Sequence, residues 1–446
     1  MPEYFHSVRL DAERCKGCVT CIRRCPTEAI RIRGGKARII ESRCIDCGEC
    51  IRRCPNHAKR AVTDNFIDLK RYKYNIALPA PTLYAQFSPD IGVNKILCGL
   101  IKIGFDAVYE VACGAEVVSA AVREYLAQNE YKRPLISSAC PAVVKLIQVK
   151  FPELIEHLVP IDAPVEVTAK MARTASRSEH NLTDAEIGIW FITPCPAKMT
   201  EVRQPLGSDK SAVTGTIAIT EIYGSLLKAI GVSSDNEVCS QASIEGLGWA
   251  IAGGETGAAA IKRSIVVHEI HSVNEILEQI TLGKLSDIDY IEALACAGGC
   301  IGGPLTVENR FIAENNMRKR LEKMGSERGK IRLPVDSSKL LAQVKREFEP
   351  RSSFRLDEDI VKAMKKIELM QETMHKLPGL DCGSCGSPNC QALAEDIVQG
   401  GASETDCVFK LRERVRDLAK EMIDLAEKVP QSMPKYDPER DGGDGI

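Results

Sequence analysis

The chain has 446 residues, too many for one ordinary domain, and 44% of them are hydrophobic, which is enough for a sizeable core. Lys and Arg total 59 against 61 Asp and Glu, and aromatic residues make up 5%, so nothing favours nucleic acid or an anionic membrane as a partner. The N-terminus lacks an apolar signal segment and no apolar run is long enough to span a bilayer, so we expect a cytoplasmic, globular protein without membrane insertion.

Cysteine is unusually abundant, with 19 residues, and a reducing cytosol favours metal ligation over disulfides. Within residues 1–70 the pattern Cys-x2-Cys-x2-Cys-x3-Cys-Pro occurs twice, beginning at Cys15 and at Cys44. Between the two copies, the alternating segment around Gly34-Gly35 predicts a β-hairpin. The first 70 residues are therefore predicted to form a ferredoxin-like α+β module.

The spacing of this repeat also predicts which cysteines share a metal site. In the bacterial ferredoxin pattern, three close thiolates hold one [4Fe–4S] cluster and the fourth crosses to the other cluster. Zinc sites are the alternative, but they normally pair two cysteine couples and have no use for a third cysteine. The predicted ligand sets are Cys15, Cys18, Cys21 and Cys54 for the first cluster, and Cys44, Cys47, Cys50 and Cys25 for the second.

Two arginine pairs, Arg23-Arg24 and Arg52-Arg53, follow the third cysteine of each copy. We expect them on a solvated face. The alternative is that they help to dock an acidic redox partner.

Residues 71–350 change to short apolar runs that alternate with helical stretches, which predicts an α/β domain with mostly parallel sheets. Three of these strand-like runs are followed at once by a cysteine, at Cys140, Cys195 and Cys296, and Cys300 lies close to the last. Ligands of open α/β sheets collect beyond the carboxyl ends of strands. The three strand ends could therefore converge on one buried cofactor.

The same segments resemble the catalytic domain of [FeFe]-hydrogenases, whose ligand loops have the forms T-S-C-C-P, M-P-C-x-x-K and M-A-C-x-x-G-C followed by glycines. The matching segments are SSACPA at 137–142, TPCPAK at 193–198 and LACAGGCIGGP at 294–304. The resemblance extends over residues 1–330, because a ferredoxin module commonly precedes this domain.

The resemblance implies an H-cluster: a [4Fe–4S] cube bridged to a diiron unit that carries CO, cyanide and a dithiolate amine. It implies that Cys140, Cys195, Cys296 and Cys300 hold the cube, with Cys300 as the bridge. Lys198 would donate a hydrogen bond to a cyanide, the alternative being a surface lysine. Dedicated maturases insert the diiron unit, so it can be absent from a given preparation.

Four departures from the family pattern favour a slow, sensory-type (group D-like) member. Ala139 replaces the cysteine that relays protons, and Thr193 and Leu294 replace methionines that pack the diiron unit. The glycine run ends early, at Pro304, and the helix after Glu116 continues VVSAAV where efficient members place paired glutamates. Cys113 and Glu116 could supply another proton route, but we expect Cys113 in the core and Glu116 in a structural role.

Residues 351–428 are predicted to form a helical segment that contains four cysteines. The cysteine pattern resembles a small [4Fe–4S] domain of electron-transport subunits and sensor-type hydrogenases. Its predicted ligands are Cys382, Cys385, Cys390 and Cys407, with zinc as the alternative. Residues 429–446, rich in Pro, Gly and charge, are expected to be a disordered tail. Cys98, Cys113 and Cys239 are expected to have no ligand role.

The resemblance implies reversible interconversion of H2 with protons and electrons, with ferredoxin or another redox protein as electron partner. Two alternatives stay open. One is a dedicated hydrogen or redox sensor with negligible turnover and a separate signalling partner. The other is a hydrogenase-like electron-transfer or assembly protein that lacks the diiron unit.

Overall fold

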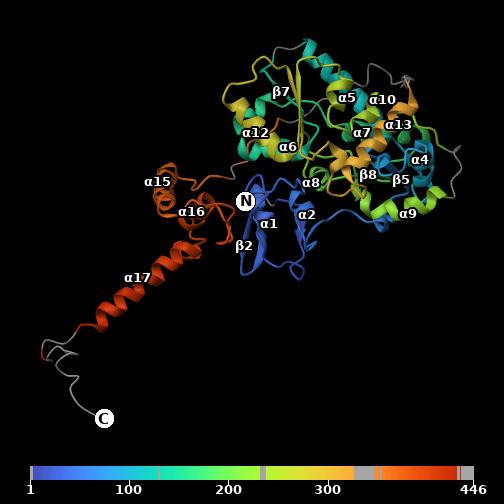
Figure 1. Ribbon diagram of the computed structural model, residues 1–446. Coiled ribbons are helices and arrows are strands. Elements are labelled where there is room, and N and C mark those ends of the chain that lie inside the picture. The colour runs from blue at the N-terminus through green and yellow to red at the C-terminus, as the bar shows by residue number, and fades with distance from the viewer. Residues whose placement is uncertain are drawn as a thin grey trace. The chain divides into compact units, whose positions relative to one another are not determined.

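The computed structural model describes residues 4–128, 131–231, 238–325, 347–351, 354–428 and 432. The chain divides into two compact units, Met1–Phe354 and Arg355–Ile446 (Figure 1). The domain boundaries expected at residues 70 and 350 stay predictions, since the first unit contains both expected N-terminal domains. The expected disordered tail, 429–446, lies outside the described residues except for Ser432.

The N-terminal part of the first unit is built from short strands and two one-turn helices. Strand β1 (Val8–Leu10) pairs antiparallel with β4 (Lys59–Ala61), and β2 (Ile30–Arg33) pairs antiparallel with β3 (Lys36–Ile39). Gly34 and Gly35 both adopt positive φ, as a two-residue hairpin turn requires, so the predicted hairpin is confirmed. The two repeats each end in a short helix, α1 (Thr20–Arg23) and α2 (Glu49–Arg53), and 3-10 turns follow at Glu41–Arg43 and Phe66–Arg71.

The larger part of this unit contains two parallel sheets, as the alternating pattern predicts. One has the order β6-β5-β8-β9 and the other the order β10-β11-β7. Strand β8 is buried along its whole length, which explains its unbroken apolar sequence, because helices cover both faces of such sheets. The strands are β5 (Tyr74–Pro79), β6 (Ala107–Val108), β7 (Leu135–Ile136), β8 (Ile187–Thr193), β9 (Gly215–Ala218), β10 (Ser264–His268) and β11 (Tyr290–Leu294).

Helices α6 and α8 begin directly after a cysteine, with proline at their first position. Proline fits there because it has no N–H to leave unpaired and its φ is already helical. Cys140 and Cys195 are thus the extended residues that precede the two helices. The helices of this part are α3 (Pro81–Tyr84), α4 (Val93–Lys102), α5 (Val111–Gln128), α6 (Pro141–Lys150), α7 (Pro164–His180), α8 (Pro196–Arg203), α9 (Ile219–Gly231), α10 (Ile244–Gly248), α11 (Gly254–Ala258), α12 (Ile270–Thr281) and α13 (Arg310–Met324), with 3-10 turns at Pro152–His157 and Cys300–Gly302.

The second unit is helical, as predicted. It contains α15 (Ile360–Lys376), α16 (Cys390–Val398), a 3-10 turn (Glu404–Asp406) and α17 (Val408–Ala426). Leu377, Leu393 and Ala394 form its small core together with Cys390 and Cys407. No helix in the described part of the chain is both long and apolar enough to cross a bilayer.

Candidate metallocofactor sites

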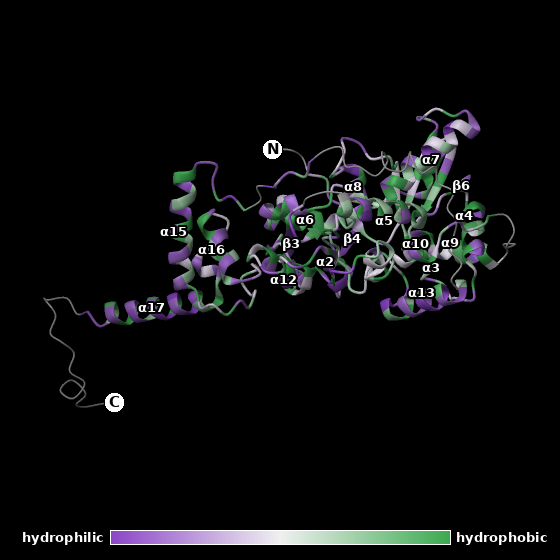
Figure 2. Ribbon diagram, turned by 90° about the horizontal axis from the view of Figure 1, so that it is seen from above, coloured by the Kyte–Doolittle hydropathy of each residue, from purple (hydrophilic) through white to green (hydrophobic). Residues whose placement is uncertain are grey.

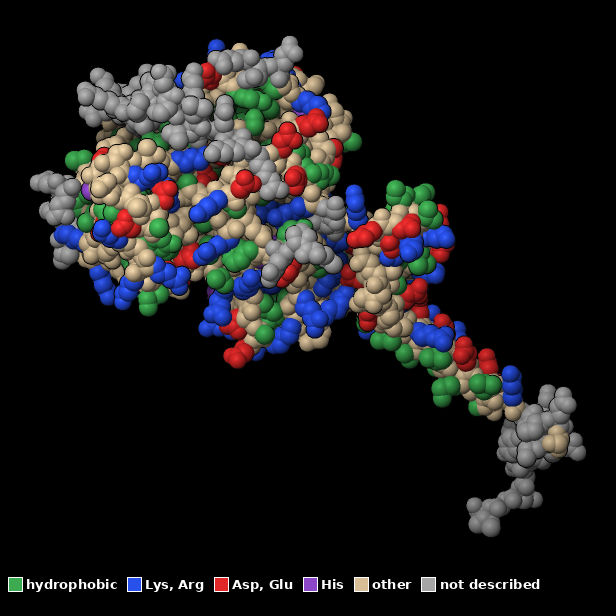
Figure 3. Space-filling view, turned by 180° about the vertical axis from the view of Figure 1, so that it is seen from behind, with side chains coloured by type: hydrophobic (Ala, Val, Ile, Leu, Met, Phe, Trp, Pro, Cys, Tyr) green, Lys and Arg blue, Asp and Glu red, His purple; other side chains and the backbone are tan. Residues whose placement is uncertain are grey.

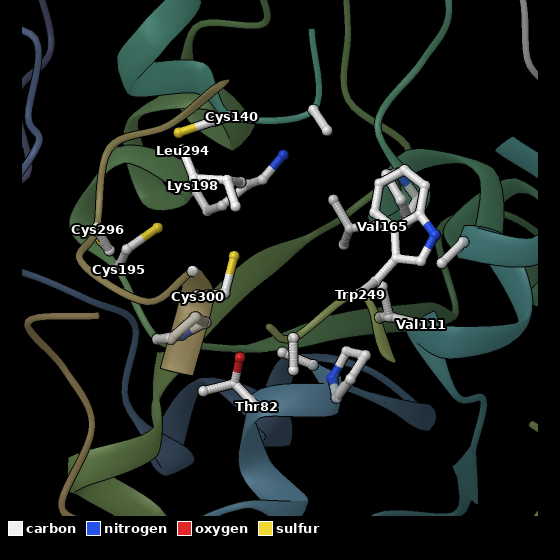
Figure 4. A pocket seen from close by; sticks show the side chains of 18 of the residues that line it. Thr82, Val111, Cys140, Val165, Cys195, Lys198, Trp249, Leu294, Cys296 and Cys300 are labelled. Atoms are coloured by element: carbon white, nitrogen blue, oxygen red, sulfur yellow. The ribbon is translucent and has the colours of Figure 1, made fainter. Parts of the chain in front are cut away.

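Four cysteines line one large cavity in the first unit. Cys140 follows β7, Cys195 follows β8, and Cys296 and Cys300 follow β11, so three strand ends converge on this space. Figure 4 shows these side chains around a common space together with Lys198. The cavity holds about 910 Å³ between atoms, part of it open to solvent.

The thiols at this cavity need a metal to ionise. Burial is the main cause that raises the pKa of Cys195 to about 12 and that of Cys296 to about 11. At neutral pH these groups are therefore thiols, and only a bound cation makes them thiolate ligands. Four such sulfurs at one cavity fit a [4Fe–4S] cube.

The cavity extends well beyond its four cysteines. Its remaining wall is mostly apolar and includes Ala80, Val111, Val165, Phe191 and Trp249. The other three four-cysteine cavities in the described residues hold only about 300 to 350 Å³ each. The large cavity thus has space for a further group beside a cube, and its apolar wall limits access of water to that group.

Each of these three smaller cavities is lined by four cysteines. The sets are those that the ferredoxin spacing and the C-terminal pattern predict, including the crossing of Cys54 and Cys25 between the two repeats. They are Cys15, Cys18, Cys21 and Cys54; Cys25, Cys44, Cys47 and Cys50; and Cys382, Cys385, Cys390 and Cys407. Four thiols in each cavity fit one iron–sulfur cluster, and which metal each site holds stays a prediction.

The second set lies next to the large cavity. Gly48, between Cys47 and Cys50, has positive φ, and a Cβ at that position would lie 2.5 Å from Pro304 Cγ and 3.1 Å from Pro196 Cγ. Pro196 follows Cys195 directly, and Pro304 closes the loop that carries Cys300. Only glycine allows this approach, so the loop of the second set packs against the loops that line the large cavity.

Arg52 joins the same two regions, although the residue is still exposed to solvent, as expected. Its guanidinium donates hydrogen bonds to Gly302 O at 2.5 Å and to Glu49 Oε2 at 2.9 Å, and it also hydrogen bonds with Cys296. Its side chain is 27% exposed. Gly302 lies 250 residues from Arg52 in the sequence, so this contact could not be predicted from the local arginine pattern. Arg23 and Arg24 are exposed, as expected.

Lys198 lines the large cavity, so the alternative of a surface lysine is wrong. Its amine lies 2.8 Å from Glu201 Oε2, and its side chain is 12% exposed. Burial alone would lower the pKa of Lys198, but the charge and the hydrogen bond of Glu201 outweigh it and raise the pKa. The lysine is therefore charged, with N–H groups available to the cavity. Ala139 and Leu294 line the same space.

Two buried carboxyl groups at this cavity were not predicted. Glu255 and Glu292 both belong to its wall. Ser137 Oγ donates to Glu255 Oε2 at 2.7 Å and accepts from Ala139 N at 3.3 Å, while Tyr290 OH donates to Glu255 Oε1 at 2.5 Å. Burial and the charge of Glu292 raise the pKa of Glu255. The sequence could have indicated Glu292, because a charged residue stands out within the apolar run of β11. It offers no such indication for Glu255.

Cys113 and Glu116 lie on α5, which contributes Val111 and Ala115 to the described wall of the cavity. Cys113 packs against the largest core cluster, and Glu116 Oε1 accepts the Ser243 N–H at 2.8 Å. These contacts fit the core and structural roles expected for the two residues. Glu255, by contrast, is linked to the backbone N–H of Ala139 through Ser137 Oγ.

A parallel α/β body with thiols gathered at its strand ends defines a protein that binds an iron–sulfur cofactor. The family model for the iron-only hydrogenase large subunit, C-terminal domain, matches residues 73–265 and 252–304. Because these residues make up more than half of the chain, the chain belongs to this family. A 4Fe-4S dicluster domain also matches residues 7–55, and an Fe-S cluster model matches residues 377–409.

Individual relatives are distant. The chain is 27% identical to the periplasmic [Fe] hydrogenase large subunit of Nitratidesulfovibrio vulgaris over 68% of this chain and 86% of that protein. It is 22% identical to iron hydrogenase 1 of Clostridium pasteurianum over 52% of this chain, and it spans 50% of that protein. Homology to hydrogenases supports an oxidoreductase with [4Fe–4S] clusters.

Two further similarities carry less weight. The nuclear prelamin A recognition factor of Homo sapiens is 22% identical over 50% of this chain and 61% of its own length. An [FeFe]-hydrogenase structure from Chlamydomonas reinhardtii overlaps 56% of this chain and 84% of its own chain, with 15% identity and a TM-score of 0.43. Because one relative bears no hydrogenase name, family membership alone does not establish hydrogen turnover.

Proposed function

We propose that this protein is a slow, sensory-type [FeFe]-hydrogenase. The observation that carries the proposal is the large cavity, in which Cys140, Cys195, Cys296 and Cys300 meet beside additional apolar space. These cysteines would hold an H-cluster cube, and Cys300 would bridge it to the diiron unit. When bound, that unit supplies the metal centre at which H2 is interconverted with two protons and two electrons.

The chain's own residues would orient this cofactor and keep water from it. Lys198 points a charged amine at the cavity and would donate to a cyanide ligand, with Glu201 fixing its position. Val165, Phe191 and Trp249 supply the apolar wall.

Electrons would pass through the ferredoxin-like repeats. Because Gly48 brings the second cysteine set against the loops of the large cavity, that set would hold the cluster nearest the H-cluster. The first set, Cys15, Cys18, Cys21 and Cys54, would then exchange electrons with ferredoxin or another redox protein. Cluster potentials are tuned by hydrogen bonds to sulfur and by burial, and both are present here.

Ala139 favours a sensor as the second candidate function. Its methyl group can neither accept nor release a proton, so turnover would be slow while binding of H2 is retained. The C-terminal four-cysteine site would relay the redox state to a signalling partner. A hydrogenase-like assembly or electron-transfer protein without the diiron unit is the remaining alternative.

Infrared spectra test the proposal on protein reconstituted with the diiron unit or produced together with its maturases. We expect bands of metal-bound CO and cyanide in the wild type and their loss in Cys300→Ser. Cys98→Ser, in a buried cysteine of α4 away from the cavity, should keep the bands. If competently reconstituted wild-type protein shows no such bands, the hydrogenase and hydrogen-sensor proposals are wrong and the assembly or electron-transfer alternative stands.

Arg52→Gln is expected to shift the midpoint potential of the H-cluster cube to more negative values by roughly 50–100 mV. Reduction adds negative charge, which the guanidinium at Cys296 stabilises. A hydrogen bond to a charged group is worth about 1.5–3 kcal/mol, and about 1.4 kcal/mol corresponds to 59 mV for one electron; partial exposure reduces the effect. Potentiometric titration followed by electron paramagnetic resonance, on protein that holds cubes only, measures it.

Arg53→Gln is the matched control for this experiment. Arg53 also pairs with Glu49, at 2.8 Å, but its side chain is 43% exposed. We expect its substitution to leave the potential of the cube within a few tens of millivolts of the wild type, on the scale of a surface ion pair. Equal shifts in the two variants would mean that Arg52 acts only through net charge.

A further inference from the structure

Within the second unit, no other described element buries a side chain of helix α17. It spans Val408–Ala426, 19 residues, and none of them is buried. In proteins most helical stability comes from packing an apolar face against a partner and not from helix propensity. Figure 2 shows apolar and polar residues interleaved along this helix, and Figure 3 shows hydrophobic side chains exposed beside charged ones.

Six large apolar residues of α17 follow a heptad repeat, while Phe409 and Ile423 lie outside it. Spacings of three and four residues alternate along the series Val408, Leu411, Val415, Leu418, Met422 and Leu425. Five of these side chains, from Leu411 to Leu425, are between 41% and 70% exposed. A repeat of 3.5 residues is the period of a coiled-coil seam rather than of a helix that packs on a globular core.

The residue types along this seam indicate how many strands it forms. Val408, Val415 and Met422 occupy the a positions, and Leu411, Leu418 and Leu425 occupy the d positions. β-Branched residues at a with leucine at d favour two strands, and two of the three a residues, Val408 and Val415, are β-branched.

The charges that flank the seam are compatible with a copy of the same helix. In a parallel pair, Arg414 would face Ala419 of the second copy and Glu421 would face Ala426 of the second copy, so like charges do not meet. In an antiparallel pair, Arg414 would face Glu421 of the second copy, which is attractive. In neither orientation does repulsion oppose self-association.

We propose that α17 forms a two-stranded coiled coil with α17 of a second copy of this chain. The interface is the seam defined by the six heptad residues. The seam begins at Val408, the first residue of the helix. The residue before it, Cys407, lines the C-terminal four-cysteine cavity. The dimer contact therefore lies beside that site, and it does not depend on the diiron unit of the proposed function.

Sedimentation equilibrium on the full chain tests this proposal, with Leu418→Lys as the variant. Leu418 is a central d position, and a lysine there would place two charges in the seam of a dimer. We expect the wild type to reach twice the chain mass with rising concentration, up to roughly 100 µM, because a seam of six positions predicts weak association. The Leu418→Lys chain should stay a monomer over the same range.

Ile423→Lys is the matched control, because it introduces the same charge on the same helix outside the seam. Ile423 is 57% exposed and occupies a b position, so this variant should dimerise like the wild type. Lysine is a good helix former, and far-ultraviolet circular dichroism should confirm that both variants keep their helices. A monomeric wild type, a dimeric Leu418→Lys chain, or equal dissociation of both variants would overturn the proposal; a monomeric wild type would leave the helix to another protein or to another face of this chain.

Discussion

Replacing Ala139 by cysteine is expected to raise hydrogen turnover by about 10²-fold, within the 10²- to 10⁴-fold range of a positioned acid–base group. Ala139 lines the large cavity and lies one residue before Cys140, so a thiol at this position would reach the space proposed for the diiron unit. The gain is placed at the low end because the protein retains a buried carboxyl group nearby. Hydrogen evolution from a reduced viologen, on fully reconstituted protein, measures it.

Ala139→Ser is the control for this gain, since it adds an atom of similar position that is a far weaker acid than a thiol. We expect turnover of the serine variant to stay within a few-fold of the wild type. Infrared spectra must show equal diiron content in all three proteins. An unchanged rate in Ala139→Cys, at equal cofactor content, would show that proton delivery at this position does not limit turnover.

Features encoded by local spacing could be predicted from the sequence. The hairpin at Gly34-Gly35 follows from two residues that tolerate positive φ, and helix α15 follows from its amphipathic period. The four-cysteine sets could be predicted because ligation fixes short spacings, and the crossing of Cys25 and Cys54 follows from the doubled pattern. The meeting of Cys140, Cys195 and Cys296 at one cavity could be predicted because each follows a strand-like apolar run.

Features that depend on tertiary packing could not be predicted. Arg52 and Arg23 occupy equivalent positions near the ends of their repeats, yet only Arg52 reaches Gly302, because only the second repeat packs against the cavity loops. Glu255 meets Ser137 because β11 lies between β10 and β7, an order that the sequence does not state. One strand exchanged in that sheet would separate these side chains.

Glu255 is the group best placed to move protons in the absence of a cysteine at position 139. It lines the cavity, and Ser137 Oγ links it to the backbone N–H of Ala139. Burial and the charge of Glu292 raise its pKa, so it holds a proton at a higher pH than an exposed glutamate and can release it near neutrality. A general acid works best when its pKa lies close to the operating pH.

Glu255→Gln is therefore expected to lower hydrogen turnover by about 10²- to 10⁴-fold at unchanged CO and cyanide bands. Glutamine keeps the size of the side chain and one of the two oxygens that accept from Ser137 and Tyr290, but it has no acidic proton to release. Glu166→Gln is the matched control: Glu166 is a buried glutamate that accepts from Ser211 and Ala212, its pKa is also raised by burial, and it lies outside the described wall of the large cavity.

The pH dependence separates a proton carrier from a structural carboxyl group. Because the folded-state pKa of Glu255 is raised, its proton stabilises the fold below the ordinary glutamate pKa, and this contribution is lost as pH rises toward the raised value. Because burial raises the pKa of both glutamates, Glu255→Gln and Glu166→Gln should each reduce the decrease in the free energy of unfolding with rising pH. Only Glu255→Gln should also remove the fall in turnover with rising pH. If its pH–rate profile matches that of the wild type, Glu255 does not carry protons to the cavity, and another group or water must deliver them.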